Sequence, residues 1–450
     1  MCGIFGVINT KERIDEGRVI AARDILAYRG PDDAGIYFSN GRQRSLDSAR
    51  DDGSASPFVA LAHRRLSIID LTSAAHQPMG SGRALSAESI GHNQEFPESS
   101  IKNQESRYVI VFNGEIYNFR DLISHLPSQR SHLTSNSDTE VILNLYSQYG
   151  KDCLSMLRGM FAFAIWDDKE KTLFAARDRF GIKPFYFLKN DNEFIFSSEL
   201  KAIKHYKGSL THSMHAIDAF LRSGSVPAPL TIYNEVSSLL PGHYLTIKPL
   251  DTSTPLSMTI KKYWEFTDLF SDNNSKMSFP RKWESKSTES VDSRVRENDR
   301  QDISSDEEND ISTNEMRRNL KDFSVEDSFE MTVDQNQESR IKYQPRKLKY
   351  DSEAKKKIRA ALLDSVGAHL VSDVEVGAFL SGGIDSTAIV SLMRQVGQEK
   401  IKTVSVVFPN NKLDESKYSR LAAKYYKTEH IEIPFYEKDL IDDFEKIMDS

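Results

Sequence analysis

Cysteine is scarce in this sequence. Only Cys2 and Cys153 occur in 450 residues. A chain of this size with so few cysteines is not a disulfide scaffold, and a reducing compartment is its natural home. We therefore expect a cytoplasmic protein.

Long apolar runs and an excess of basic charge are also missing. No stretch approaches about 18 consecutive apolar residues, and the N-terminus has no basic region followed by an apolar run. The 59 basic and 66 acidic residues give a net charge of −7, whereas a nucleic-acid groove usually needs a basic face. These absences argue against secretion, membrane spanning and nucleic-acid binding.

The first part of the chain contains a regular series of strand and helix patterns. The length suggests about two or three domains. Up to residue 206, apolar β-prone runs alternate with amphipathic helical patterns. We expect strands at 3–8, 108–112, 161–166, 172–176 and 185–188, and helices at 18–26 and 139–149. This mixture predicts an α/β fold (α+β overall), with a layered sandwich over residues 2–206.

The middle of the chain is polar. Residues 207–268 read as connecting strands, among them 243–247. Residues 269–347 are rich in Ser, Asn, Asp, Glu, Arg and Lys, without apolar periodicity, so we expect a disordered insert. Residues 80–107 have the same character, and the pentapeptide Asn-Gln-Glu-Ser-Arg occurs in both segments.

Ordered patterns return in residues 348–450. A helix is expected at 354–366, then a strand at 376–380, a helix at 387–396, a strand at 403–408 and a helix at 418–426. This alternation predicts a parallel sheet. Two parallel strands make a poor core, so we expect this domain to be incomplete.

Cys2 is a candidate nucleophile because of its position. Removal of Met1 would put a thiol and a free α-amine on one residue. An α-amine has a pKa of about 7.7–8.0 and can act as the base for its own side chain. The alternative is a chance cysteine at the start of a buried strand.

Three further clusters carry groups that suit such a nucleophile. Residues 64–70 place two arginines just before a strand-like run, and guanidinium groups bind carboxylates. Residues 112–118 end a strand with Asn113 and a flexible Gly114, which are suitable oxyanion donors. Residues 137–140 open a helix, where Asp138 is placed to bind an ammonium. Taken singly, each has a structural interpretation: surface arginines, a hairpin turn and an N-cap.

The segment Ser381-Gly-Gly-Ile-Asp-Ser386 lies between a predicted strand and a predicted helix. Glycines allow a tight turn, and a helix N-terminus directs unpaired N–H groups at an anion. Asp385 would suit Mg²⁺ bridging to phosphates. No Gly-x-x-x-x-Gly-Lys-Ser/Thr element occurs, so this is not a conventional P-loop. A glycine turn capped by Ser386 is the alternative.

Together these elements resemble the class II glutamine amidotransferases. The motifs are Cys2-Gly-Ile-Phe-Gly, Arg29-Gly-Pro-Asp, Arg65-Leu-Ser-Ile-Ile-Asp, Phe112-Asn-Gly-Glu-Ile-Tyr-Asn, Ser137-Asp-Thr-Glu, Gly159-Met-Phe-Ala-Phe and Arg177-Asp-Arg-Phe-Gly. With the Ser381–Ser386 segment, the chain is similar to the glutamine-hydrolysing asparagine synthetases over residues 2–268 and 348–450. The resemblance implies an N-terminal-nucleophile αββα sandwich followed by a partial Rossmann-like ATP-pyrophosphatase domain.

The resemblance also implies roles in glutamine hydrolysis. Cys2 would attack the glutamine side-chain amide, and Asn113 and Gly114 would hold the oxyanion. Arg65, with Leu66 beside it, would bind the α-carboxylate. Asp138, and Glu115 as a second group, would bind the α-ammonium.

At a second site, ammonia would meet an activated aspartate. ATP would adenylate aspartate with release of pyrophosphate. The implied ATP-binding residues are Leu380, Ser381, Gly382, Gly383, Asp385, Ser386 and Val406. ATP and Mg²⁺, held at Asp385, are the implied cofactors, small molecules are the partners, and a homodimer is left open.

The sequence departs from the family at its C-terminus, since family members continue through further helices that complete the synthetase site. We therefore expect glutamine hydrolysis to survive and synthesis to be weak or absent. Two other interpretations stay open. One is an amidotransferase that acts on another carboxylate, such as a sugar acid or a peptide. The other is an inactive remnant that serves as a binding protein.

Overall fold

The computed structural model describes residues 1–39, 58–81, 106–124, 126, 133–248, 255–266, 352–409 and 414–436, together with 438, 441, 443 and 444. The expected disorder of 269–347 and most of the polar stretch 80–107 lie outside these residues. Among the helices described, none combines the length and the apolar character needed to cross a bilayer.

The first sheet is antiparallel and has the order β10-β8-β9-β1-β3-β2. Its strands are β1 (Gly3–Asn9), β2 (Asp33–Ser39), β3 (Phe58–Arg65), β8 (Tyr186–Lys189), β9 (Glu193–Ser197) and β10 (Val236–Ser238). The chain therefore begins in the interior of a sheet, with β1 hydrogen-bonded on both sides.

The second sheet is also antiparallel, in the order β12-β11-β7-β6-β5-β4. It consists of β4 (Met79–Gly80), β5 (Tyr108–Ile116), β6 (Gly159–Asp167), β7 (Thr172–Arg177), β11 (His243–Lys248) and β12 (Ser257–Lys262). The segment 207–268, expected as a connection, thus contributes strands to both sheets. The domain boundaries stay a prediction.

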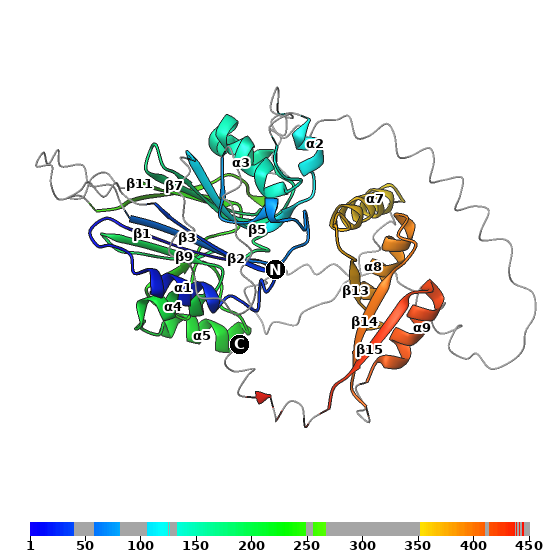
Figure 1. The fold of residues 1–450 in the computed structure, drawn as a ribbon. Coiled ribbons are helices and arrows are strands. Elements are labelled where there is room, and N and C mark those ends of the chain that lie inside the picture. The colour runs from blue at the N-terminus through cyan, green and yellow to red at the C-terminus, as the bar shows by residue number, and fades with distance from the viewer. Residues whose placement is uncertain are drawn as a thin grey trace, which may run out of the picture. The chain divides into compact units, whose positions relative to one another are not determined.

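Helices cover the outer faces of the two stacked sheets (Figure 1). The first sheet is covered by α1 (Glu16–Asp24) and α4 (Leu200–Lys207), which α5 (Met214–Ser223) follows. The second is covered by α2 (Phe119–Ile123) and α3 (Asp138–Tyr149). One apolar core lies between the sheets and one lies under each helical layer. This arrangement confirms the αββα sandwich.

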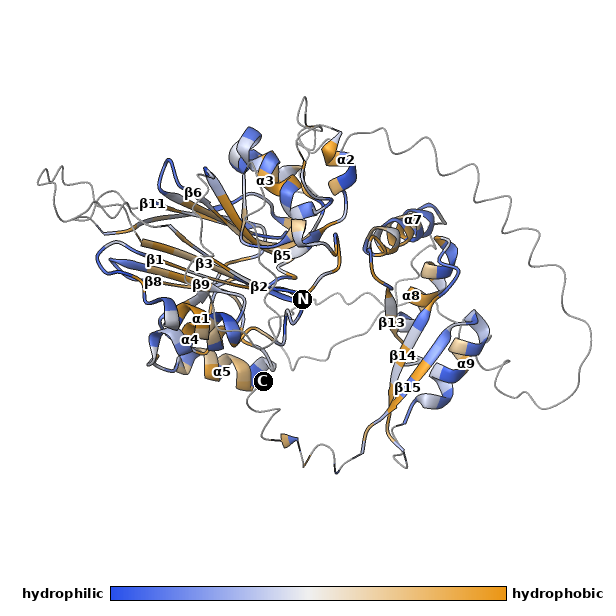
Figure 2. Cartoon of the chain, in the orientation of Figure 1, coloured by the Kyte–Doolittle hydropathy of each residue, from blue (hydrophilic) through white to orange (hydrophobic). Residues whose placement is uncertain are grey.

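Strand β1 is buried on both faces, which explains its unbroken apolar sequence. Ile4 and Ile8 pack into the core between the sheets. Phe5 and Val7 pack into the core under the helices. In Figure 2 the apolar residues accordingly concentrate in the strands and on the helix faces that meet them. This double burial holds the segment that follows Cys2 in one place.

The C-terminal part forms a parallel sheet, as expected, in the order β13-β14-β15. Its elements are β13 (Gly377–Phe379), β14 (Lys402–Val407) and β15 (Glu429–Pro434), with α7 (Ser352–His369), α8 (Ile384–Gln395) and α9 (Ser416–Tyr426). The expectation of only two strands was wrong. Strand β15 was missed because its charged residues alternate with isoleucines in a run of six residues.

Two local expectations in the sandwich were also wrong. The Asn113–Gly114 pair does not end a strand, because β5 continues to Ile116 and pairs with β6 along its whole length. The arginines at 64 and 65 do not precede a strand but end β3. In both places pairing between distant strands overrides the local signal.

Asp178 fixes the loop between β7 and β8. Its side chain is almost fully buried, and it accepts the backbone N–H groups of Phe161, Phe180, Ile182 and Lys183 at 3.0–3.2 Å. One carboxylate thus ties the loop to β6. This contact gives a physical reason for the Arg-Asp-Arg-Phe-Gly motif.

We expect Asp178→Ala to lower the free energy of unfolding by about 3 kcal/mol or more, because it leaves several buried N–H groups without an acceptor. Chemical denaturation followed by tryptophan fluorescence measures the effect. Asp191→Ala is the matched control, since Asp191 is exposed and surface substitutions usually change stability by about 0.5 kcal/mol or less. Equal stability of the two variants would contradict the assignment.

Candidate functional site

One pocket gathers the residues that sequence analysis singled out in the sandwich. Its volume is about 500 Å³, open mouth included. Its lining comprises Met1, Cys2, Arg65, Leu66, Ile68, Ile69, Ala75, Gln77, Phe112, Asn113, Gly114, Glu115, Ser137, Asp138, Thr139 and Lys183. Every predicted glutamine-site residue is therefore in this lining. Their individual roles stay predictions.

Cys2 lies at the entrance to β1 and is held by its main chain. Its carbonyl accepts from Arg29 Nε at 3.1 Å, and its Sγ lies 3.5 Å from the N–H of Leu66. Burial raises the pKa of the Cys2 thiol, while the Leu66 N–H and Arg65 oppose that rise. Met1 is 55% exposed, so it is accessible to trimming. Burial lowers the pKa of the α-amine at Met1.

Asn113 presents an unpartnered amide to this pocket. The residue is fully buried, and neither Nδ2 nor Oδ1 has a hydrogen-bond partner among the described residues. A buried amide without partners costs free energy unless a ligand satisfies it.

The backbone of β5 adds a second donor. In an antiparallel pair, alternate residues direct N–H groups to the same edge. On the edge away from β6, the Phe112 N–H donates to Gln77 Oε1 at 2.8 Å, and the Ile116 N–H donates to Asp138 Oδ2 at 2.9 Å. Gly114 lies between them, so its N–H points to the same edge. A Cβ at Gly114 would lie 2.2 Å from the carbonyl oxygen of Met160, so the close packing onto β6 requires glycine.

Below this edge, His63 of β3 links the two sheets. Its Nε2 lies 3.0 Å from the Phe112 carbonyl. Burial lowers the pKa of His63 to about 3, so the ring is neutral and the contact requires Nε2 to carry the proton. This hydrogen bond connects β5 of the second sheet to β3 of the first sheet.

Arg65 is buried at the end of β3 and is oriented by carbonyl groups. Its guanidinium donates to the carbonyls of Ile69, Asp70 and Thr72. Asp70 adopts a left-handed conformation with φ of 53°, and its carboxylate accepts from the N–H of Asn136 at 2.7 Å. The loop that holds Arg65 is thereby tied to the segment that leads into α3.

Asp138 begins α3 and faces the pocket from the opposite wall. Ser137 caps the helix, and Asp138 is only 4% exposed. Burial raises the pKa of Asp138 to about 7. Burial also raises the pKa of Glu115, whereas Lys183 lowers it. The pocket thus contains two carboxyls whose ionised forms are costly in the absence of a cation.

Two cations of this site were not predicted as site residues. Arg29 binds the Cys2 carbonyl and pairs with Glu199. Lys183 is 4% exposed and lines the pocket. Arg29 appeared only within a motif, and no local pattern marks Lys183, since its burial depends on the loop that Asp178 fixes.

The Ser381–Ser386 segment forms a turn between β13 and α8. Helix α8 begins at Ile384 rather than Thr387, so Asp385 and Ser386 lie in its first turn. Ser386 Oγ accepts from the Ser381 N–H at 3.3 Å. The N-cap Gly383 provides no side-chain cap, so this helix end retains N–H groups able to bind an anion.

Gly382 accounts for the glycine requirement of this turn. Its φ is +83°, and a Cβ would lie 2.6 Å from the backbone nitrogen of Ser419 in α9. Asp385 is exposed. Within the described ranges, no group of three or more His, Cys, Asp and Glu side chains could hold a metal ion. The metal role of Asp385 stays a prediction.

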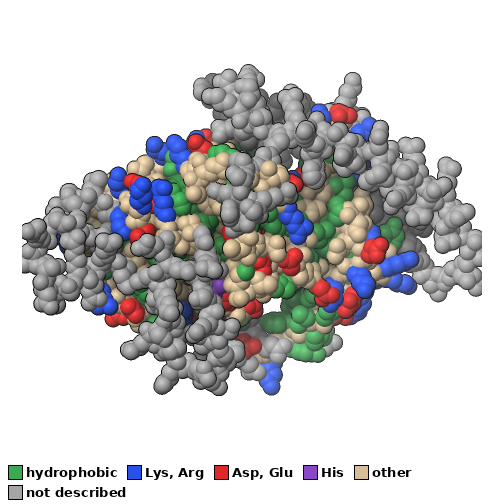
Figure 3. Space-filling model, turned by 45° about the horizontal axis from the view of Figure 1, so that its top comes forward, with side chains coloured by type: hydrophobic (Ala, Val, Ile, Leu, Met, Phe, Trp, Pro, Cys, Tyr) green, Lys and Arg blue, Asp and Glu red, His purple; other side chains and the backbone are tan. Residues whose placement is uncertain are grey.

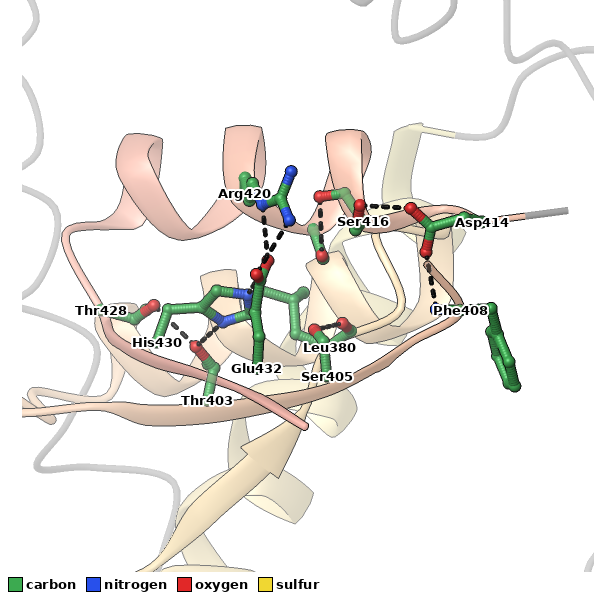
Figure 4. A network of polar contacts seen from close by, with 11 residues as sticks. Leu380, Thr403, Ser405, Phe408, Asp414, Ser416, Arg420, Thr428, His430 and Glu432 are labelled. Atoms are coloured by element: carbon green, nitrogen blue, oxygen red, sulfur yellow. Dashed lines mark hydrogen bonds and ion pairs between the residues drawn. The ribbon is translucent and has the colours of Figure 1, made fainter. Parts of the chain in front are cut away.

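The two remaining predicted ATP-site residues lie differently. Leu380 is fully buried in the core of this part, so its side chain does not line an open surface, whereas Val406 is 48% exposed. Beside them a polar network links α9 to the sheet (Figure 4). Arg420 pairs with Glu432 at 2.7 Å, and Thr403 Oγ1 contacts His430 Nδ1 at 2.9 Å. The Arg420–Glu432 pair ties α9, the helix that packs against Gly382, to β15, and the Thr403–His430 contact joins β14 to β15.

Comparison with known proteins agrees with this geometry. A family model described as a glutamine amidotransferase domain matches residues 1–264, and one described as asparagine synthase matches residues 357–450. The sequence is 31% identical to a putative glutamine-hydrolysing asparagine synthetase 2 of Methanocaldococcus jannaschii, over 100% of this chain and 67% of that protein. The chain belongs to the glutamine-hydrolysing asparagine synthetase family.

Other members of this asparagine synthetase family are longer. Identity is 25% to asparagine synthetase 3 of Bacillus subtilis, over 99% of this chain and 56% of that protein. Identity is 27% to asparagine synthetase 1 of the same organism, over 100% of this chain and 52% of that protein. The chain thus spans about half to two thirds of the length of these relatives. The resemblance inferred from the motifs is confirmed.

The raised pKa of Asp138 predicts a dependence of stability on pH. Because the folded-state pKa of about 7 exceeds the ordinary value of 3.8, the folded protein binds the extra proton. The stabilising contribution is lost as the pH rises through about 7. We expect Asp138→Asn to have a higher melting temperature than the parent chain. The difference between the two melting temperatures should increase from pH 5 to pH 8.

Asp168→Asn is the control for this titration. Burial acts to raise the pKa of Asp168, but hydrogen bonds from Lys171, Trp166 and Ser39 outweigh it and lower the pKa. The difference in melting temperature between Asp168→Asn and the parent should therefore stay constant between pH 5 and pH 8. A constant difference for Asp138→Asn as well would show that Asp138 is already ionised.

Proposed function

We propose that the sandwich hydrolyses the side-chain amide of glutamine with Cys2 as the nucleophile. The observation that carries this proposal is the fully buried, unpartnered amide of Asn113, which lines the same pocket as Cys2. An oxyanion that forms in this pocket would satisfy that amide.

The chemistry requires Met1 to be removed. Cys2 Sγ then bonds to the amide carbon, and the thiol proton passes to the α-amine. The oxyanion accepts from Asn113 Nδ2 and the Gly114 N–H. When the carbon–nitrogen bond breaks, the proton moves to the leaving nitrogen, which departs as ammonia and leaves a thioester. Water hydrolyses the thioester to glutamate and restores Cys2.

Charges on the walls suit the amino-acid part of glutamine. Arg65 retains donors beyond those that bind carbonyls, since a guanidinium has five N–H groups, and it would bind the α-carboxylate. Asp138 and Glu115 would bind the α-ammonium. This cation would favour the ionised forms of both carboxyls, whose pKa values burial raises.

For the complete enzyme we propose ATP-dependent asparagine synthesis from aspartate, with glutamine as the ammonia donor. The Ser381–Ser386 turn and the first N–H groups of α8 would bind the ATP phosphates, and Mg²⁺ would connect these to Asp385. Aspartate would attack the α-phosphorus to give an acyl-adenylate and pyrophosphate. Ammonia would then displace AMP.

The remaining partner and location proposals rest on composition. The two cysteines are free, which suits a cytoplasmic location. On the face drawn in Figure 3, basic and acidic side chains are interspersed over the described residues. The net charge of −7 supports small-molecule substrates rather than nucleic acid. A homodimer is compatible with the proposal, and size-exclusion chromatography with light scattering tests it.

We expect Cys2→Ala to abolish ammonia release from glutamine by the Met1-trimmed protein. Asn113→Ala should lower kcat by about 10²–10³-fold and change KM much less, because its amide acts mainly on the oxyanion. A coupled glutamate assay measures both. Cys153→Ala is the control, since Cys153 is buried in the core away from the pocket. No ammonia release by the trimmed parent would overturn the proposal.

At the second site, Asp385→Asn should weaken binding of Mg²⁺–ATP by about tenfold, the loss typical of one charge-assisted contact. Binding of ATP in EDTA should not change. Isothermal titration of the chain measures both affinities, and Glu399→Gln, an exposed change beyond the same helix, is the control. Equal loss with and without Mg²⁺ would exclude the metal role of Asp385.

A further inference from the structure

Lys183 is a buried residue whose ammonium has no hydrogen-bonding partner among the described residues. It is 4% exposed, and it lines the pocket together with Cys2 and Glu115. Among the described residues, its Nζ forms neither a hydrogen bond nor an ion pair. A lysine residue that is this little exposed is usually paired, so an ammonium that faces the pocket without a partner points to a role there.

The main chain of Lys183 is fixed. Its N–H donates to Asp178 Oδ2 at 3.0 Å, and its carbonyl accepts from Arg177 Nε at 2.8 Å. Both peptide groups that flank the Cα of Lys183 are thus hydrogen-bonded. The ammonium is therefore presented to the pocket by a rigid support rather than by a surface loop.

Five charged groups face the start of β1 from different elements: Arg29 after α1, Arg65 of β3, Glu115 of β5, Asp138 of α3, and Lys183 of the loop between β7 and β8. Arg29 is neutralised by Glu199. Arg65 is bound by carbonyl groups and lies where the substrate carboxylate is proposed to bind. Among the described residues, the Lys183 ammonium is bound by neither a carboxylate nor a carbonyl group.

We propose that Lys183 is a positioning residue of the glutaminase site, whose ammonium keeps the α-amine of trimmed Cys2 in its unprotonated, proton-accepting form. The inference rests on the proposed glutamine hydrolysis. A second positive charge nearby makes protonation of the amine unfavourable, and burial in the same pocket strengthens that repulsion. The same ammonium attracts the thiolate that forms when the amine accepts the proton.

The charge interactions agree with this role. For the α-amine, now on Met1, burial is the main cause of its lowered pKa, and Lys183 and Arg29 lower it further. Burial lowers the pKa of Lys183 itself, while Glu115 and Cys2 raise it. Glu115 thus helps Lys183 to remain charged. Trimming of Met1 would move the amine to Cys2.

The test compares Lys183→Met, which keeps length and loses charge, with Lys183→Arg, which keeps charge. Alkylation of Cys2 by iodoacetamide is measured from pH 5.5 to 9.5 on the Met1-trimmed full chain, with the modified peptide identified by mass. Cys153 does not interfere, because burial raises its pKa to about 12. Glutamine kcat/KM is measured over the same range.

Each profile has an acid limb, the range in which the rate rises with pH. In Lys183→Met we expect this limb to move to higher pH by about one unit or more, because a nearby positive charge is lost. Lys183→Arg should keep the parental limb, and so should Lys169→Met, an exposed control. An unmoved limb in Lys183→Met overturns the proposal, whether or not its maximal rate falls. A higher glutamine KM with an unmoved limb would assign Lys183 to the substrate instead.

The two proposals fail separately. If the parent chain does not hydrolyse glutamine but the alkylation limb moves in Lys183→Met, the proposed function is wrong and the electrostatic role of Lys183 holds. If the parent hydrolyses glutamine and neither limb moves, the proposed function holds and the role of Lys183 is wrong.

Discussion

The shortness of β4 is the constraint on which the pocket beside Cys2 depends. This strand pairs with β5 only at Val109 and Ile110, so the rest of that edge has no neighbouring strand. Three alternate N–H groups then point away from β6. The first binds Gln77 and the third binds Asp138. The middle one, at Gly114, has no partner among the described residues and is the donor proposed for the oxyanion. A longer β4 would consume the donor that an oxyanion needs, so the chemistry of the pocket follows from where one strand ends.

Charge balance is the second constraint. Asp138 is a buried carboxyl and Glu115 a partly buried one, and burial raises the pKa of both. Lys183 and Arg65 are buried cations in the same lining. A zwitterionic amino acid would add one charge of each sign. Binding therefore changes the pairing of the buried charges without changing their sum. In the proposed function, the α-ammonium and α-carboxylate of glutamine would therefore pair with charges that already line the pocket.

Much of this could be predicted from sequence, and the failures have physical causes. The apolar run after Cys2 and the Ser137 cap were sufficient to predict β1 and the start of α3. Asn113–Gly114 was misinterpreted because Asn-Gly is a strong hairpin signal, whereas pairing with β6 makes it the interior of a strand. The burial of Lys183 depends on Asp178 and on distant strands, so no local pattern reports it. The αββα layers followed from motif resemblance, and the pocket required the structure.

Both candidate sites use backbone N–H groups that the fold leaves unpaired, and each requires glycine for a different reason. At Gly114 the backbone is an ordinary strand, and the obstacle to a side chain is the Met160 carbonyl across the ladder. At Gly382 the positive φ excludes most side chains before any neighbour is considered, and the backbone of Ser419 lies close as well. The first glycine permits close approach of strands, and the second permits the turn that brings the N-terminus of α8 beside the end of β13. Loss of either would therefore alter the position of donors rather than remove a reacting group, which is why these glycines belong to the sites although neither has a side chain.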